Sequence, residues 1–270
     1  MTTRSIPTGS AAASPLFELG KVRFEAGSAT LLDGIDLTIA PERVTGLIGH
    51  NGSGKTTLMR LLARHHTQSA GSIRFAGKPI ASWGPREFAR QVAHLPQYTP
   101  ATDGMQVHEL VALGRYPWHG SFGVFGKEDR EHVIEAMHMT DVAQYANRTV
   151  DSLSGGERQR VWIAMLIAQD SRCLLLDEPT SALDIAHQID VLDLVRKLCA
   201  QRRMAVVIVL HDINMAARFC DQIVALRHGR VLMQGTPRDI MTEPNLNAIY
   251  GVPMNVLRDP NGGHLVGVPQ

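Results

Sequence analysis

Short apolar runs recur along the chain, and each is followed by a polar turn and then by a stretch with helical spacing. This alternation is typical of a parallel β-sheet covered by helices. The runs at 173–176 and 205–210 are almost continuously apolar, as expected of strands buried on both faces. The runs that predict strands are Val44–Ile48, Val92–Leu95, Cys173–Leu176 and Ala205–Leu210.

Polar residues stand where these runs end. Asp177 and His211 directly follow the last two runs, and Gln97 follows the second. Thr56 stands just after a glycine-rich turn that follows the first. Parallel strands bring their carboxyl ends to one edge of a sheet, where open α/β folds bind ligands. We therefore expect these four side chains to lie together.

Residues 98–155 have a different pattern, which predicts helices and no strand. Val107–Leu113 and Lys127–Met139 have helical spacing, and the segment 114–126, rich in Gly and aromatic residues, predicts a connecting loop. We interpret 98–155 as a helical subdomain inserted into the α/β core. The first helix of that core is predicted over Lys55–His66.

The remaining segments complete a domain expected to span 15–253. Gln222–Arg227 and Val231–Gln234 predict strands, and Thr236 followed by Pro237 predicts the start of a short helix. Residues 1–14, rich in Thr, Ser, Ala and Pro, predict a disordered leader without a signal peptide. Residues 254–270 are expected to form a C-terminal tail.

Composition excludes several function classes. The 270 residues carry a net charge of +1, which gives no electrostatic reason to expect a nucleic-acid partner. No apolar run approaches the roughly 20 residues that cross a bilayer. Three cysteines at 173, 199 and 220 are too widely spaced for a zinc pair, so we expect buried, inert thiols. The pair His65-His66 is interpreted as a solvated helix end rather than a metal site, because adjacent helical side chains diverge.

A phosphate-binding loop is predicted between the first strand and the first helix. The glycines of this loop let backbone N–H groups approach phosphate oxygens, and the following helix directs its positive end at them. Lys55 is expected to reach the β- and γ-phosphates, Thr56 to bind Mg²⁺, and Thr57 to join the phosphate-binding residues. The loop reads Gly49, His50, Asn51, Gly52, Ser53, Gly54, Lys55, Thr56.

The strand that ends at Asp177-Glu178 predicts the second half of this site. An apolar strand would deliver Asp177 to the magnesium ion and Glu178 to a water molecule in line with the γ-phosphate. The alternative is an acidic helix cap after a core strand.

A third motif opens a helix whose apolar face includes Val161 and Ala164. Ser154 can cap this helix, and Glu157 can close a capping box. The cap alone does not explain Gly155 and Gly156, since each costs up to about 1 kcal/mol of helix stability relative to Ala. Small residues there leave backbone N–H groups open to an anion.

Together with Leu153, this motif resembles the signature of the ATP-binding cassette ATPases, the motor subunits of ABC transporters. The resemblance implies a P-loop NTPase core with an antiparallel β part near the N-terminus, and ATP and Mg²⁺ as cofactors. It implies two chains paired head to tail, with Ser154 to Glu157 of one chain on the γ-phosphate held by the other. Gln97 would sense Mg²⁺ and touch membrane subunits, the segment 181–184 with Asp184 would cross the dimer interface, and His211 would lie near the γ-phosphate. Many members stack adenine on an aromatic residue before a glycine; here that position is Ala26, and Phe24 is the substitute.

A narrower resemblance, in segments 114–120, 170–173 and 211–217, is to the ATPase of bacterial ferric hydroxamate siderophore importers. It implies an ATPase on the cytoplasmic face of the inner membrane, with transmembrane permease subunits and, indirectly, a periplasmic binding protein as partners. Importers of haem, cobalamin and other siderophores form the wider group. Tyr116-Pro117-Trp118 is either a packed aromatic loop or a subunit contact. The rival functions are a soluble cassette of DNA repair or translation and a scaffold that binds nucleotide without hydrolysis, against which the intact Glu178 and His211 argue.

Overall fold

A six-stranded sheet forms the centre of the computed structural model, which describes residues 14–120, 123–258 and 265–270. The strand order is β10-β9-β3-β8-β7-β6; strands β9 to β6 run parallel, and β10 is antiparallel to β9. The mostly parallel sheet is confirmed, and every strand predicted for it begins and ends within one residue of its observed bounds. These bounds are Val44–Ile48 (β3), Val92–Leu95 (β6), Cys173–Leu176 (β7), Ala205–Val209 (β8), Gln222–Arg227 (β9) and Arg230–Gly235 (β10). Residues 1–13 of the predicted leader lie outside the described residues.

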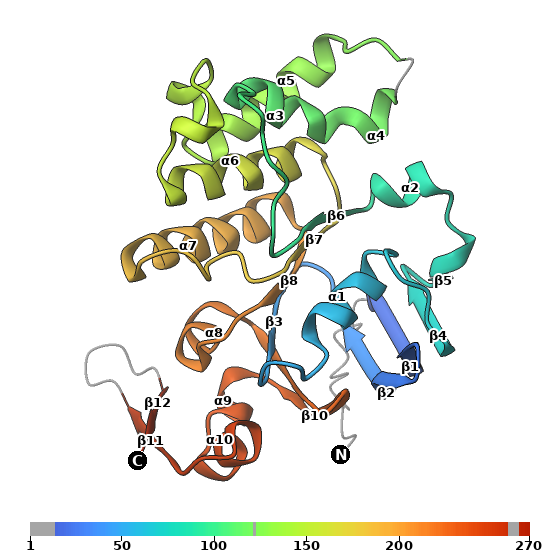
Figure 1. Cartoon of the computed structure of the whole chain (residues 1–270), viewed down its shortest axis with the longest axis vertical. Coiled ribbons are helices and arrows are strands. Elements are labelled where there is room, and N and C mark those ends of the chain that lie inside the picture. Colours follow the sequence, from blue (N-terminus) through green and yellow to red (C-terminus); the bar gives the residue numbers. More distant parts are fainter. Residues whose placement is uncertain (1–13, 121–122, 259–264) are drawn as a thin grey trace, which may run out of the picture.

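An antiparallel sheet near the N-terminus, also expected, packs beside the first (Figure 1). Helix α1 (Lys55–Leu62) lies between the two sheets and buries Leu58 and Leu62 in a core shared with Phe17 and Phe75. The strand order is β2-β1-β4-β5. The bounds are Phe17–Ala26 (β1), Ala29–Ile39 (β2), Ala70–Phe75 (β4) and Lys78–Pro79 (β5).

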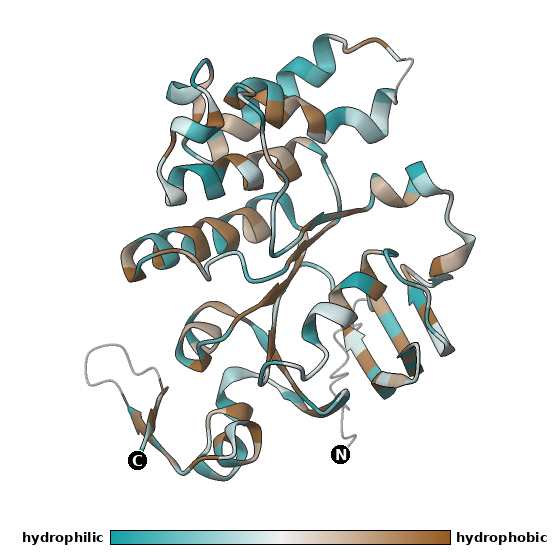
Figure 2. Cartoon of the chain, viewed as in Figure 1, coloured by the Kyte–Doolittle hydropathy of each residue, from teal (hydrophilic) through white to brown (hydrophobic). Residues whose placement is uncertain are grey.

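The central strands are buried on both faces, as their continuous apolar runs predict. In β7, Cys173 and Leu175 face the core around α1, while Leu174 and Leu176 face the opposite core. Figure 2 shows these strands as the most hydrophobic part of the chain. Helices α6 (Gly155–Ala168), α7 (Ile185–Arg202) and α8 (Ile213–Phe219) cover the second face. The three cysteines are buried and unpaired, as predicted, and burial raises the pKa of Cys199 to about 11 and of Cys220 to about 12.

Helices between β6 and α6 pack on α6 at one end of the molecule (Figure 1). They are α3 (Val107–Ala112), α4 (Tyr116–His119) and α5 (Lys127–Met139), with 3₁₀ turns η2 (Leu113–Arg115), η3 (Ala143–Tyr145) and η4 (Val150–Ser152). The expectation of a plain loop over 114–126 is wrong for its first half, because η2 and α4 occupy 114–119. Pro117 in the first turn of α4 is compatible with a helix start. A further turn and helix, η1 (Ile80–Ser82) and α2 (Pro85–Ala89), precede β6.

Helix α1 ends one turn earlier than predicted. Arg64 adopts a left-handed backbone with φ 59°, and its guanidinium donates to the carbonyl of Trp83 at 2.8 Å. His65 and His66 therefore lie beyond the helix. The ring of His66 stacks on Phe24 at 5.0 Å between centroids, and the His65 ring contacts that of His94 at 4.9 Å. His65 is exposed and His66 is half-buried, so the pair is solvent-accessible as predicted, but it lies past the helix end and both rings also make tertiary contacts.

The segment after β10 packs against α8. It contains α9 (Pro237–Ile240), which Thr236 precedes as predicted, α10 (Glu243–Tyr250), and a hairpin of β11 (Met254–Arg258) and β12 (Leu265–Pro269). The Asn214 side chain on α8 accepts from the backbone N–H of Gly267 at 2.7 Å and donates to its carbonyl at 3.1 Å. The expected tail thus includes a docked hairpin. Among the described residues, no helix has the length and apolarity needed to span a membrane.

Candidate active site

The glycine loop joins β3 to α1 and takes backbone conformations that glycine favours. Gly49 has φ 140° and Gly54 has φ 102°. A Cβ on Gly49 would meet the carbonyl oxygen of Leu226, so a larger residue cannot occupy this position. The loop directly follows the carboxyl end of β3, so these glycines lie at the carboxyl edge of the parallel sheet.

Lys55 is the buried cation of this loop. Its ammonium donates to the carbonyls of Gly49 at 2.7 Å and His50 at 3.0 Å, and the residue is 5% exposed. Burial lowers the pKa of Lys55, and the nearby Glu178 and Asp177 carboxylates oppose this shift. The Ser53 hydroxyl is buried and has no hydrogen-bond partner within the described part of the chain. A buried cation beside an unpartnered hydroxyl and a glycine loop fits a polyphosphate.

Asp177 and Thr56 meet beside this loop, as predicted. The Thr56 hydroxyl lies 3.4 Å from the Asp177 carboxylate, which is 2% exposed. Burial raises the pKa of Asp177, and the adjacent Glu178 carboxylate raises it further, while the Thr56 hydrogen bond lowers it. A divalent cation here would relieve the cost of a buried carboxylate, and hydroxyl, carboxylate and amide oxygens are the donors that Mg²⁺ prefers. Thr56 and Asp177 therefore fit this cation, and the predicted third ligand, Gln97, lines the same cavity as Thr56.

Glu178 is held from both sides by the two other predicted strand-end residues. The Gln97 amide donates to one carboxylate oxygen at 2.6 Å, and His211 Nε2 lies 2.9 Å from the other. The Glu178 side chain is 10% exposed and its backbone is left-handed, with φ 53°. A strained, immobilised carboxylate at the mouth of a charged cavity is typical of a catalytic base.

Lys55, Thr56, Gln97, Glu178 and His211 line one cavity of about 330 Å³, which we name the carboxyl-edge cavity; Asp177 is not among its lining residues. Leu31 on β2 also lines this cavity and was not predicted from the sequence. Leu31 is 38% exposed in a strand whose other face is buried, which is unusual for a leucine. The lining residues are Leu31, Asn51, Gly52, Gly54, Lys55, Thr56, Thr57, Gln97, Glu178 and His211. Of the predicted loop residues, His50 turns its ring the other way, toward Tyr250 at 5.9 Å between centroids.

The signature residues lie apart from that cavity, at the start of α6. The predicted capping box is confirmed: Ser154 Oγ accepts from the Glu157 N–H at 3.3 Å, and Glu157 accepts from the Ser154 N–H at 2.8 Å. Hydrogen bonds from Tyr145 and Ser154 lower the pKa of Glu157 to about 2. Gly156 packs directly against the ring of His187, whereas a Cβ on Gly155 would meet only Leu183, at 3.5 Å.

Asp184 stands beside this helix start, at the beginning of α7. Its carboxylate accepts from the backbone N–H of His187 at 2.9 Å, and this hydrogen bond lowers the pKa of Asp184. Asp184 and Ser154 to Glu157 therefore form one surface, which is separate from the carboxyl-edge cavity of the same chain.

The adenine position is less defined than the phosphate site. Ala26 is exposed at the end of β1, before the turn at Gly27. Phe24 is half-buried and lies parallel to the His66 ring, with 16° between the planes. One face of Phe24 is thus covered by His66.

Comparison with known proteins agrees with these motifs. The ABC transporter family profile matches residues 32–181. The iron(3+)-hydroxamate import ATP-binding protein FhuC of Bacillus subtilis is 40% identical, with 83% of each chain covered. The ferric enterobactin transport ATP-binding protein FepC of Escherichia coli is 41% identical, again with 83% of each chain covered. The hemin import ATP-binding protein HmuV of Streptomyces coelicolor is 40% identical and covers 90% of this chain and 86% of its own.

The fold has a matching relative among solved structures. An ABC transporter described as being of the metal-chelate type, in an inward-facing conformation, superimposes with a TM-score of 0.84 at 26% identity. The match covers 95% of this chain and 97% of that chain. The glycine loop, the strand carboxylates and the signature helix thus occur in a fold and a sequence that agree with one family. The chain belongs to the ATP-binding proteins of the ABC transporter family.

Proposed function

We propose that this chain is the ATP-hydrolysing subunit of a bacterial importer that takes up iron(III)-hydroxamate siderophores across the inner membrane. The observation that carries the catalytic part is the Glu178 carboxylate held between Gln97 and His211 beside buried Lys55. ATP bound here would supply the phosphoanhydride bond that is hydrolysed, and Mg²⁺ would offset the negative charge of its phosphates.

Each side chain then has a role that follows from its place. Lys55 would bind the β- and γ-phosphates, and Thr56, Asp177 and Gln97 would hold the cation. Glu178 would accept the proton of the attacking water. His211, 2.9 Å away, would orient Glu178 relative to the γ-phosphate. The held carboxylate argues against a scaffold that binds nucleotide without hydrolysis.

A complete site requires a second copy of the chain in this proposal. The helix start at Ser154 to Glu157 offers backbone N–H groups but lies outside the carboxyl-edge cavity of its own chain. Head-to-tail pairing would bring it to the cavity of the other copy, with Asp184 at the interface. The room around Gly155 supports this, because an added Cβ would make only an ordinary contact with Leu183 at 3.5 Å, so a partner's phosphate has room to approach the glycine.

Permease subunits would dock where the core meets the helical subdomain. A cavity of about 460 Å³ lies there, between the end of α1, helix α2, β6 and Gln169 at the end of α6. Trp118 contacts Gln169, one of the lining residues: its indole donates to the Gln169 carbonyl at 2.7 Å, and the guanidinium groups of Arg90 and Arg115 lie over its ring. Trp118 is thus packed, and its 38% exposure leaves a surface that a permease subunit could contact in this proposal.

The cargo is the least constrained part of the proposal. Relatives named for hydroxamate, enterobactin and hemin transport are all 40–41% identical to this chain, so identity does not choose among them. Haem, cobalamin or another siderophore is the alternative cargo. A soluble ATPase of DNA repair or translation is the more distant alternative, and a net charge of +1 gives it no support.

The paired site can be tested with Glu178→Gln, which should bind ATP and accumulate a dimer detectable by light scattering. Adding Gly155→Leu should abolish the dimer while each chain still binds ATP by calorimetry. Gly84→Leu is the matched control, since Gly84 also lies at a helix start, with an ordinary φ of −59°, and should leave the dimer intact. A dimer that survives Gly155→Leu would exclude the proposed role of the signature.

The cargo can be tested in cells that lack this chain. Uptake of radiolabelled ferrichrome, a hydroxamate siderophore, should return with the wild-type chain and not with Lys55→Ala. Enterobactin and hemin uptake, measured in the same cells, should stay unchanged. If only hemin uptake were restored, the cargo would be haem and not a hydroxamate siderophore. If no uptake were restored, the result would favour a soluble ATPase of DNA repair or translation.

A further inference from the structure

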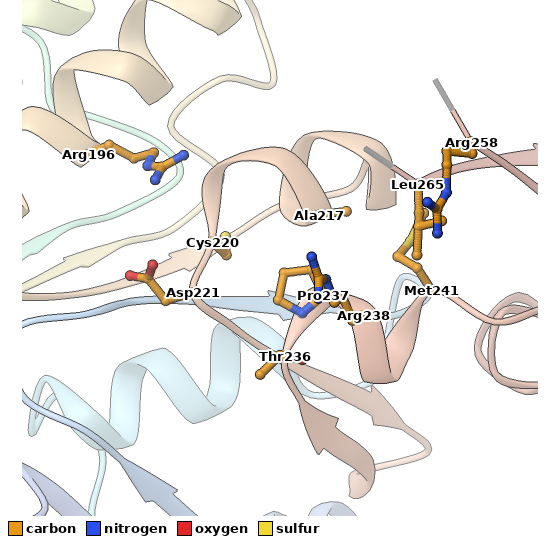
Figure 3. A pocket seen from close by; sticks show the side chains of 10 residues that line it. All are labelled: Arg196, Ala217, Cys220, Asp221, Thr236, Pro237, Arg238, Met241, Arg258 and Leu265. Atoms are coloured by element: carbon orange, nitrogen blue, oxygen red, sulfur yellow. The ribbon is translucent and has the colours of Figure 1, made fainter. Parts of the chain in front are cut away.

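A larger cavity than either of those described above lies at the opposite, amino edge of the parallel sheet. Its volume is about 1060 Å³, and we name it the amino-edge cavity. Segments far apart in the sequence enclose it: the later part of α7, the end of α8, the start of α9 and the C-terminal hairpin (Figure 3). Asp221 at the start of β9 places it at the end of the sheet away from the glycine loop. The nucleotide chemistry leaves it unexplained.

Positive charge dominates this cavity. Arg196, Arg238 and Arg258 line it, against the single carboxylate of Asp221. That carboxylate accepts a hydrogen bond from the Val44 N–H at 2.8 Å. Within the described part of the chain, neither Arg238 nor Arg258 has an acidic partner within ion-pair distance. A chain with a net charge of only +1 thus gathers three guanidinium groups around the amino-edge cavity, two of them without an acidic partner among the described residues.

The wall between the arginines is apolar. Met241 is 2% exposed, and Ala217 and Leu265 are partly buried beside it. Figure 3 shows Arg196 and Arg258 at opposite ends of the cavity, with Arg238 between them. The arrangement suits a molecule with separated acidic groups on a carbon frame, since guanidinium forks bind carboxylate and phosphate oxygens in pairs.

The wall that carries Arg258 and Leu265 is also fixed in place. Both residues belong to the C-terminal hairpin, which the Asn214 side chain ties to α8 through two hydrogen bonds with Gly267, of 2.7 and 3.1 Å. Arg196 is positioned from the other side, where its guanidinium donates to the Arg218 carbonyl at 3.1 Å. A cavity with held walls loses less entropy when a ligand binds.

We propose that the amino-edge cavity binds a small organic polyanion, a molecule with two or more carboxylate or phosphate groups on an apolar frame. The volume is at the upper end of the several hundred to about 1,000 Å³ typical of small-molecule sites. Arg238 and Arg258 bind the acidic groups, and Met241 and Leu265 contact the frame. The site is independent of nucleotide binding, because no residue that lines it lines the carboxyl-edge cavity.

The test is calorimetric titration of the full chain with trimesate, a benzene tricarboxylate, and with bisphosphoglycerate, in excess Mg²⁺ and ADP so that nucleotide occupies the glycine loop. At least one probe should bind with a Kd below about a millimolar. Arg238→Ala and Arg258→Ala should each weaken it roughly tenfold, as expected for a lost charge-assisted contact. Tighter binding of trimesate would indicate a carboxylate ligand, and tighter binding of bisphosphoglycerate would indicate a phosphate ligand.

The matched control is Arg130→Ala on α5, which removes the same charge from an exposed site elsewhere. It should leave the affinity unchanged. Equal weakening by Arg130→Ala would show that bulk charge attracts the probe, and the proposal would be wrong. Failure of both probes would also overturn it, as would binding of a polyglutamate peptide alone, which would make this face a protein contact.

Discussion

The two cavities at opposite edges of the sheet differ in how their charged groups are held. At the carboxyl edge, within about 330 Å³, Lys55 is fixed by two carbonyls and Glu178 by Gln97 and His211. At the amino edge, within about 1060 Å³, Arg238 and Arg258 are exposed and have no acidic partner among the described residues. The first arrangement fixes the geometry that a reaction needs. The second supplies charge with looser geometry, which suits binding rather than chemistry.

Polar groups elsewhere extend this contrast. His94 has two buried ring nitrogens, and Tyr250 a buried hydroxyl, without a hydrogen-bond partner within the described part of the chain. Asn214, in contrast, makes two hydrogen bonds with one residue. If held groups serve function or stability, removing one should cost more than removing an unpartnered neutral hydroxyl such as that of Tyr250, whereas the buried His94 should show its effect only as the pH falls.

The largest effect is expected from Glu178→Gln, which removes the base and keeps the shape of the side chain. ATP turnover should fall by about a hundredfold to ten-thousandfold, as for other general bases, while ATP affinity stays near that of the wild type. Steady-state hydrolysis and calorimetry measure the two. Glu131→Gln on the exposed face of α5 is the control. Glu178→Gln should not change trimesate binding at the amino-edge cavity. If this variant turned over ATP at nearly the wild-type rate, Glu178 would not be the general base.

The next largest effect concerns His94 and acid stability. Burial lowers the pKa of His94 to about 4, from an ordinary 6.5, with His65 and Arg60 adding to the shift. The unfolded chain therefore takes up this proton first as the pH falls. The stability is fully present above about pH 6.5 and is lost progressively toward pH 4, by up to about 3 kcal/mol.

His94→Leu should flatten this part of the pH dependence, measured by urea unfolding between these pH values. The exposed His138→Leu on α5 is the matched control and should keep the wild-type slope. If the two variants gave the same slope, His94 would not be the group responsible.

A smaller effect is expected from Asn214→Ala, which removes both hydrogen bonds between α8 and the C-terminal hairpin. The free energy of unfolding should fall by about 1–3 kcal/mol. Asn147→Ala in an exposed turn should cost much less. Hydrogen exchange should also show faster opening of the hairpin amides, and unchanged exchange would mean that apolar packing alone holds the hairpin.

The smallest effect is expected from Tyr250→Phe. Burial raises the pKa of Tyr250, and the hydroxyl contributes no hydrogen bond within the described residues, so its removal should change the unfolding free energy by less than about 0.5 kcal/mol. A loss above about 1 kcal/mol would reveal a partner such as an ordered water molecule. The comparison with Asn214→Ala then separates held from unpartnered groups within one segment.

Much of the central sheet was predictable because buried parallel strands must be apolar on both faces. The runs at 44–48, 92–95 and 173–176 matched β3, β6 and β7 without an error in their bounds. The capping box at Ser154 was predictable for a similar reason, since its hydrogen bonds join residues three apart. Both features depend on local spacing.

The errors occurred where distant residues decide a local shape. Helix α1 ends at Leu62 because Arg64 turns to reach the Trp83 carbonyl, and nothing near Arg64 in the sequence announces that partner. The turn of His50 toward Tyr250 and the packing of Phe24 on His66 are likewise contacts between separate segments.

The sequence by itself determined the family, the glycine loop and the order of strand-end residues, because these depend on backbone conformation and on periodicities that a few neighbouring residues encode. Only the tertiary structure decided how these residues meet: Gln97 and His211 on one carboxylate, and the signature helix apart from the cavity of its own chain. The amino-edge cavity likewise follows only from the tertiary structure. Arg196, Arg238 and Arg258 share no local motif, and the packing of α7, α9 and the C-terminal hairpin brings them together around this cavity.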